Sequence, residues 1–193
     1  VGSEMCIRDS IYYGFAQYLP SSYLPLIGRL FNSIRILCVK GIFKKCGKIS
    51  TIDRCAYFGN GFDVEIGDYS GIGANCFLPN NIKIGKYVMM APEVFIAKNN
   101  HRFDKTATPM CFQGASENGI TIIEDDCWIG RRVIMTPGRH IKKGSIIATG
   151  SVLTKDFDEY SIIGGNPAKL IKKRIYKTCL LYTSDAADDL IGV

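Results

Sequence analysis

The stretch that decides the fold runs from Ile123 to Asp158 and reads IEDDCWIGRRVIMTPGRHIKKGSIIATGSVLTKDFD. An aliphatic residue returns at every sixth position of it, and the same period fills the stretch from Ile66 to His101. A period of six matches neither an α-helix nor a simple strand alternation. It is typical of a parallel β-helix, in which each hexad forms a short strand and a corner, and three hexads close one triangular coil. The twelve aliphatic positions are Ile66, Ile72, Leu78, Ile84, Met90, Ile96, Ile123, Ile129, Met135, Ile141, Ile147 and Leu153.

A second, smaller position follows four residues after the aliphatic one and would face the same interior. It is held by Ser70, Cys76, Ile82, Val88, Val94, Cys127, Val133, Ser145 and Ser151. A weaker coil is expected before the repeats, between Lys48 and Glu65, with Ile52, Phe58 and Val64 in this smaller slot. The sequence therefore predicts an all-β solenoid of about five coils that occupies residues 48–174.

The segment before the repeats, residues 11–47, has a helical pattern instead. Leu26, Leu30, Ile34 and Leu37 recur at spacings of four, four and three, with basic residues between them. The open strand edge at the end of a solenoid is an aggregation template unless something covers it, so we expect this helix to be a cap. A helix lying in a membrane interface is the competing interpretation, because residues 11–28 carry no charge and the residues after them are basic.

Two terminal segments do not belong to this pattern. Residues 1–10 (VGSEMCIRDS) and 179–193 (CLLYTSDAADDLIGV) share neither the repeat nor the basic character of the rest. They resemble translated sequencing-adapter read-through, and we interpret both as artefacts that fold reasoning should leave out. Without them the chain loses one basic and five acidic residues, and its formal charge rises from +6 to +10.

The composition of the remaining chain predicts one domain in a reducing compartment. About 168 residues suit a single domain. The six cysteines show no CxxC pair and match no zinc template, and no signal peptide is visible, so we expect a cytoplasmic protein without a metal. The positive charge favours an anionic partner such as a phosphate-bearing cofactor. Nucleic acid is not expected, because the basic residues gather at the two ends of the sequence rather than among aromatic residues along one face.

The repeat has one large interruption, which begins after His101. The next slot should fall at position 102, but the pattern resumes at Ile123, and this offset of 21 is not a multiple of six. Residues 102–122 are therefore expected to leave the prism as a loop. His101 closes the strand beside this loop and follows two asparagines. Imidazole is the natural general base near neutral pH, so His101 is the candidate catalytic residue.

Motifs in unbroken order make a family resemblance specific. They are MMAPEVFIAKNNHRFD (89–104), PMCFQG (109–114), IEDDCWIGRRVIMTPG (123–138), GSVLTKD (150–156) and YSIIGGNPAKLIKKR (160–174). Together they resemble the hexapeptide-repeat O-acetyltransferases related to the maltose, galactoside and capsular-polysaccharide acetyltransferases. The earlier stretches YYGFAQYLPSS (12–22) and FKKCGK (43–48) resemble the polysaccharide-modifying branch. The resemblance implies a left-handed parallel β-helix and a homotrimer with active sites in the clefts between subunits.

The resemblance also implies roles for individual residues. His101 matches the catalytic histidine. Independently of the resemblance, Asp104 lies three residues beyond this base and could orient the imidazole, accept a substrate hydroxyl, or simply cap the loop. Gly130 and Arg131 lie where backbone N–H groups would stabilise an oxyanion, although the family generally has a small residue in place of Arg131. Asn75 and Asn81 lie near the positions that would hold the sugar acceptor. Trp128, the only tryptophan, is either a coil anchor or a wall of the acceptor pocket. Coenzyme A would be bound by Thr149, Thr154, Lys155, Lys169 and Lys172.

We therefore predict a homotrimeric, acetyl-CoA-dependent O-acetyltransferase that modifies a sugar hydroxyl in cell-surface polysaccharide synthesis. Another acceptor, such as an antibiotic or an amino sugar, and a longer acyl donor remain open within the same chemistry. A γ-type carbonic anhydrase shares the prism but needs three metal-binding histidines, and this chain has two. A non-catalytic solenoid would lack the histidine-bearing loop. The basic N-terminal segment adds the hypothesis of peripheral membrane contact.

Overall fold

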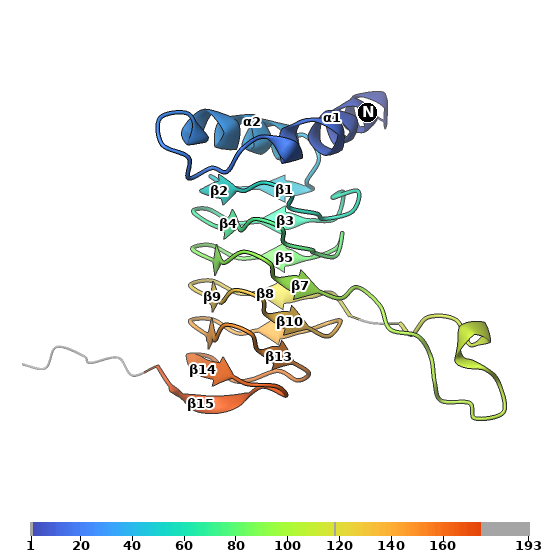
Figure 1. Cartoon of the computed structure of the whole chain (residues 1–193). Coiled ribbons are helices and arrows are strands. Elements are labelled where there is room, and N and C mark those ends of the chain that lie inside the picture. Colours follow the sequence, from blue (N-terminus) through green and yellow to red (C-terminus); the bar gives the residue numbers. More distant parts are fainter. Residues whose placement is uncertain (1, 118, 175–193) are drawn as a thin grey trace, which may run out of the picture.

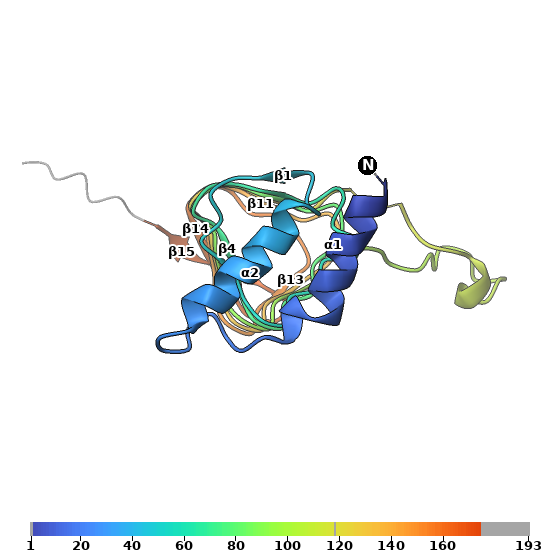
Figure 2. The same cartoon turned by 90° about the horizontal axis from the view of Figure 1, so that it is seen from above.

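The structure is a computed structural model that describes residues 2–117 and 119–174, so segment 179–193 lies outside the described residues. The chain forms a parallel β-solenoid with a helical cap over its first coil and one long excursion from its side (Figure 1). Short strands stack into three faces of a triangular column, which is seen from above in Figure 2.

The three faces contain the strands in a regular order. The first face stacks β1 (Lys45–Cys46), β3 (Glu65–Ile66), β5 (Lys83–Ile84), β8 (Ile122–Ile123) and β11 (His140–Ile141). The second stacks β2 (Thr51–Ile52), β4 (Gly71–Ile72), β6 (Met89–Met90), β9 (Trp128–Ile129), β12 (Ile146–Ile147), β14 (Ser161–Gly164) and β15 (Lys169–Lys173). The third stacks β7 (Phe95–Ile96), β10 (Ile134–Met135) and β13 (Val152–Leu153), and Tyr57 and Phe77 extend it through isolated bridges. Five complete coils and a partial sixth result, and the antiparallel strand β15 closes the end.

The hexad residues form the core of the column, which confirms the predicted fold class. All twelve aliphatic positions are at most 7% exposed, and all nine smaller positions are at most 1% exposed. Equivalent residues pair across coils eighteen residues apart, as Ile129 does with Ile147. Burial raises the pKa of the Cys76 and Cys127 thiols to about 11, so both packing cysteines stay protonated near neutral pH.

The first coil departs from the predicted register. β1 begins at Lys45, so the solenoid starts inside the segment 11–47 that was assigned to the cap. Ile52 pairs with Ile72, and Phe58 follows the Tyr57–Phe77 bridge, which places both residues in the larger aliphatic slot rather than the smaller one. The shift arises between Phe58 and Val64, where Gly59 and Gly61 adopt left-handed φ and make a longer turn than in the later coils. Val64 keeps the predicted smaller slot.

The cap consists of α1 (Gly2–Gly14), the 3-10 turn η1 (Ala16–Tyr18) and α2 (Gly28–Lys40). Both helices lie across the end of the column (Figures 1 and 2), so the predicted cap helix is confirmed, but α1 also includes residues 2–10, which the sequence had led us to set aside as an artefact. The face that α2 buries, however, is not the predicted one. Of the four residues predicted to face inward, Ile34 is half-buried against the core, whereas Leu26 (before α2), Leu30 and Leu37 are 101%, 59% and 70% exposed. The buried side of α2 includes Arg35 and Val39.

Hydrogen bonding to the open strand edge explains this orientation. Asn32 of α2 accepts a hydrogen bond from the Ile52 N–H (3.0 Å) and donates one to the Ser50 carbonyl (2.9 Å), as a neighbouring strand would. Backbone groups at a buried edge must find partners, and a row of leucines offers none. The side of α2 that carries Asn32, Arg35 and Val39 therefore faces the first coil, and Leu30 and Leu37 face away from it.

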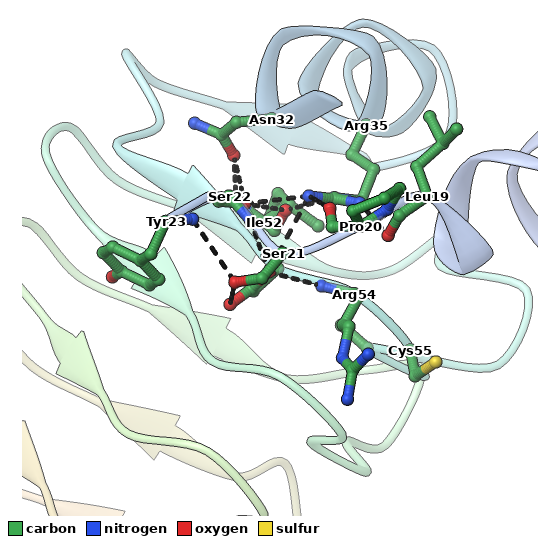
Figure 3. Close-up of polar contacts among 12 residues, drawn as sticks. Leu19, Pro20, Ser21, Ser22, Tyr23, Asn32, Arg35, Ile52, Arg54 and Cys55 are labelled. Carbon is green, nitrogen blue, oxygen red and sulfur yellow. Dashed lines mark hydrogen bonds and ion pairs between the residues drawn. The ribbon is translucent and has the colours of Figure 1, made fainter. Parts of the chain in front are cut away.

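Arg35 completes the junction between cap and column (Figure 3). Its guanidinium has no exposed surface and donates to the carbonyls of Ile52 (2.7 Å), Leu19 (3.0 Å) and Pro20 (3.1 Å). It also lies 3.7 Å from the buried carboxylate of Asp53. Burial lowers the pKa of Arg35, and the charge of Asp53 opposes this effect. The junction is thus a satisfied polar network inside an otherwise apolar fold.

The excursion after β7 leaves the column as predicted and projects away from it as an arm (Figure 1). His101 and Ala115 form an antiparallel bridge at its root, and the 3-10 turn η2 (Met110–Phe112) lies further out. The arm ends slightly earlier than the predicted range 102–122, because Thr121 is buried and Ile122 already belongs to β8.

Candidate active site

The candidate base His101 lies at the root of the arm. The backbone around it is held by hydrogen bonds from Arg102 N–H to the Gly114 carbonyl (2.9 Å) and from Ser116 N–H to the Asn100 carbonyl (2.8 Å). The His101 side chain is exposed and lines an open cleft of about 470 Å³ together with Asp104 and Ser116. A two-stranded root therefore positions an accessible imidazole, as a general base requires.

Asp104 shares this cleft but is paired elsewhere. Its two carboxylate oxygens accept hydrogen bonds from Arg102 Nε and Nη2, each at 3.3 Å. These bonds from Arg102 lower the pKa of Asp104. In this arrangement Asp104 is a charged partner of Arg102 in the cleft that His101 also lines, and its oxygens keep further acceptor capacity.

The proposed oxyanion donors lie at another edge of the column. We name the edge between the second and third faces the 2/3 edge and the edge between the third and first faces the 3/1 edge. Gly130 lies at the 2/3 edge, and its N–H already donates to the Ile147 carbonyl at 2.8 Å. The strand ladder therefore uses the Gly130 N–H, and an oxyanion role for Gly130 stays a prediction. Gly130 allows the next coil to pack closely against its backbone, because a Cβ at this position would lie only 2.6 Å from the Thr149 backbone nitrogen.

The next residue, Arg131, has an anchored side chain. Its guanidinium is bonded to the carboxylate of Glu93 on the preceding coil, and Arg132 binds the same carboxylate. These two arginines lower the pKa of Glu93. This pairing directs the Arg131 side chain along the outside of the coil toward Glu93. The arginine therefore fits where the family usually has a small residue, and the strand pairing of β9 and β12 is unchanged.

The three residues expected to contact the acceptor lie at three different places. Trp128 is half exposed on the second face, Asn75 is an exposed corner residue with φ 55° at the 2/3 edge, and Asn81 lies at the 3/1 edge. Trp128 lines a shallow groove of about 260 Å³ with Tyr23 and Tyr69. The sequence did not indicate Tyr23 as a site residue. Tyr23 lies beside Trp128 only because the Arg35 hydrogen-bond network holds the loop that carries it.

Two of the predicted cofactor lysines meet at the closed end of the column. Lys155 and Lys169 line a cleft of about 400 Å³. Lys142 and Lys173 line it too. The sequence did not indicate Lys142, because this residue belongs to an earlier coil. Thr154 precedes Lys155 at the 3/1 edge, whereas Thr149 lies at the 2/3 edge and Lys172 does not line this cleft. Four ammonium groups around one cleft can bind phosphate groups, although Asp156 and Asp158 also line it.

One chain therefore distributes the candidate residues over two edges of the column. His101, Thr154 and Lys155 lie along the 3/1 edge, and Gly130, Arg131 and Thr149 lie along the 2/3 edge, with the third face between them. His140, the second histidine, lies apart from both sets on the first face, where its Nε2 is 2.6 Å from Glu124. Among residues 2–117 and 119–174, no three His, Cys, Asp or Glu side chains gather as a metal site would require. In the same ranges, no helix has the length and apolar character needed to cross a membrane.

Comparison with known proteins gives consistent relatives. The family description "Hexapeptide repeat of succinyl-transferase" matches residues 120–155. A putative acetyltransferase of Saccharomyces cerevisiae is 32% identical over 137 residues, which are 70% of this chain and 68% of the relative. The chain spans less than two thirds of the length of several other curated relatives that it matches.

Solved structures agree with this relationship. A maltose O-acetyltransferase from Clostridium difficile is 26% identical, with 90% of each chain covered and a TM-score of 0.64. A hexapeptide-repeat-containing acetyltransferase from Vibrio cholerae, solved in complex with acetyl coenzyme A, shares the fold with a TM-score of 0.68 at 22% identity, over 90% of this chain and 89% of that one. The repeat, the histidine at the root of the arm and the yeast relative together place this chain in the family of hexapeptide-repeat acetyltransferases.

Proposed function

We propose that this protein transfers an acetyl group from acetyl-CoA to a hydroxyl of a sugar, and that the acceptor belongs to cell-surface polysaccharide synthesis. The observation that carries the proposal is the exposed His101, held at the root of the arm beside an open cleft. A sugar acceptor is supported by the likeness to a maltose O-acetyltransferase. The polysaccharide setting rests on the resemblance of residues 12–22 and 43–48 to the polysaccharide-modifying branch.

In the proposed reaction, the His101 imidazole removes the proton of the attacking hydroxyl. The hydroxyl oxygen bonds to the thioester carbonyl carbon and forms a tetrahedral oxyanion. The oxyanion collapses, the carbon–sulfur bond breaks, and the imidazolium returns its proton to the thiolate. General base catalysis of this kind is worth on the order of 10² to 10⁴ in rate.

The oxyanion would be stabilised by the backbone N–H of Arg131. The Gly130 N–H belongs to the ladder, and among the described residues no hydrogen bond occupies the Arg131 N–H. The Arg131–Glu93 pair holds the side chain to one side, which leaves this donor free to approach a carbonyl oxygen.

Coenzyme A would lie along the column, with its phosphates at the closed end. Lys155 and Lys169, with Lys142 and Lys173, supply positive charge for the phosphates in their common cleft. Thr154 and Thr149 would border the pantetheine arm, and Lys172 is exposed on β15 for an outer phosphate. The acceptor would be held near Asn75, Asn81 and Trp128.

We further propose that the site is completed between copies of the chain, in a homotrimer. His101 and Arg131 lie at different edges of one column, so a single chain does not present both to one thioester. Rotational symmetry brings the 3/1 edge of one protomer beside the 2/3 edge of the next. The arm carries exposed apolar residues, Phe103 and Phe112 at 75% and 78%, which a neighbouring protomer could cover.

Thiol release from acetyl-CoA, measured with a panel of free and nucleotide-linked sugars, tests this function. We expect release with at least one sugar and a loss of about 10² to 10⁴ in kcat/KM for His101→Ala. His140→Ala is the matched control, because it removes the second imidazole from a different face, and its turnover should equal that of the parent. Undiminished turnover of His101→Ala would remove the assigned base, and no release with any sugar would remove the acceptor class.

A further inference from the structure

The outer surface of the cap combines features that the proposed acyl transfer does not use. Residues Leu26, Leu30 and Leu37 form what we name the outer leucine stripe. Steps of about 100° per residue place Leu30 and Leu37 on one side of α2 and Arg35 and Val39 on the other. Because Val39 faces the column, the stripe points away from it, over the end of the molecule that Figure 2 shows.

The backbone also holds one of these leucines in solvent. Leu26 is 101% exposed and adopts φ 69°, in the left-handed region that residues with a side chain rarely occupy. Strained residues of this kind persist where the surrounding structure requires them and gather at functional sites. The turn that presents Leu26 is closed by hydrogen bonds from Ile27 N–H to the Pro25 carbonyl and from Gly28 N–H to the Leu24 carbonyl, both 2.9 Å.

The segment of the chain that carries the stripe has charged residues of a single sign, although α1 of the same cap contains Glu4 and Asp9 and Lys44 lies 3.8 Å from Glu65. Residues 10–52 contain no aspartate or glutamate. Arg29 and Lys40 lie on α2 beside the stripe, and Lys44, Lys45 and Lys48 follow at the rim of the cap, all of them exposed. A basic helix surface with an exposed apolar stripe is the pattern that binds anionic lipid surfaces.

We propose that the cap docks this protein on an anionic phospholipid membrane, with the outer leucine stripe in the headgroup region and the basic rim against the lipid phosphates. A second copy of the cap is a poorer occupant, because two surfaces of the same positive sign repel each other. Docking by the cap orients the long axis of the column perpendicular to the membrane surface. The two long edges that hold the candidate site then remain open, so docking and acyl transfer use separate surfaces.

Flotation with vesicles tests this proposal without any measurement of turnover. The full chain should bind mixed phosphatidylcholine–phosphatidylglycerol vesicles and bind pure phosphatidylcholine vesicles at least about tenfold more weakly, with the difference shrinking as salt is raised. The double variant Leu30→Ser, Leu37→Ser should lose at least about tenfold in binding to the mixed vesicles. Arg29→Gln with Lys40→Gln should weaken binding to the mixed vesicles only.

The matched control is Leu170→Ser with Ile171→Ser on β15, at the opposite end of the column, where the side chains are 48% and 60% exposed. It should bind vesicles as the parent does. Circular dichroism and size-exclusion chromatography should show unchanged fold and mass for every variant, since the substituted residues are exposed. Equal binding of the parent to both vesicle types, vesicle binding by the leucine variant at the parental level, or a fall in mass caused by the leucine variant would overturn the proposal. The last result would identify a second copy as the occupant.

Discussion

At the scale of single residues, Arg35 shows how a charged residue can be the largest fully buried side chain of a cap. Its guanidinium donates to four carbonyls and faces Asp53, which in turn accepts hydrogen bonds from Ser22 N–H (2.9 Å) and Arg54 N–H (2.8 Å). Such a network stabilises the fold only while all its members are present.

Replacing Arg35 by Met should therefore destabilise the protein strongly. The change leaves the Asp53 charge and several carbonyls buried without their partner, which costs about 3–5 kcal/mol in the free energy of unfolding. Arg29→Met, on the exposed side of the same helix, should change it by less than about 0.5 kcal/mol. Urea unfolding followed by circular dichroism measures both. Equal effects of the two substitutions would show that the Arg35 network contributes little.

At the scale of elements, the arm is separable from the column. Its root is closed by the His101–Ala115 bridge, while the chain beyond the root carries exposed apolar residues. The coils on either side of it stack directly, because β7 pairs with β10 and β5 pairs with β8. The column therefore does not need the arm in order to close.

Replacing residues 104–113 by a short Gly-Ser linker should leave the column stable and lower acyl transfer. The expected shift in thermal midpoint is under about 4 °C, which corresponds to ~1 kcal/mol. Turnover should fall because the cleft beside His101 loses a wall. Phe103→Ser with Phe112→Ser is the finer variant, since it keeps the chain length and removes only the apolar contacts. A thermal midpoint lowered well beyond that range would mean that the arm belongs to the core.

At the scale of the whole molecule, the two-edge arrangement predicts sharing of active sites between protomers. His101→Ala and Thr149→Trp, the latter blocking the 2/3 edge, should each be inactive alone. Co-expressed at equal levels, they should recover about one quarter of the parental turnover, because random assembly gives that fraction of intact interfaces between neighbours. Thiol release by the mixed, co-purified protein measures this, and each variant expressed alone is the control. No recovery in mixtures shown to contain both chains would place the complete site within one chain.

The sequence was sufficient to predict the column and to place His101 at the large interruption of the repeat. Period-six spacing specifies burial directly, because each coil repeats the same local geometry, and the twelve aliphatic positions lie in the core. The sequence was insufficient to predict the slot of Ile52 and Phe58, because that slot depends on the longer turn after Phe58. It was also insufficient to predict that the Gly130 N–H bonds to a strand of the next coil. The basic cleft shows the same limit, since Lys142 meets Lys169 only through the stacking of coils.

By itself, then, the sequence determined the repeating column, the arm and the imidazole at its root, because these follow from contacts between residues close in the chain or one coil apart. Only the tertiary structure decided which side of α2 faces inward and which edges carry the candidate site. Amphipathic spacing predicts that a helix has two different faces, but it does not predict which of them is buried. Here the backbone groups at the edge of the first coil form hydrogen bonds with Asn32 and Arg35, and the leucines therefore lie on the outside. That choice depends on hydrogen bonds between distant segments, and no local pattern records it.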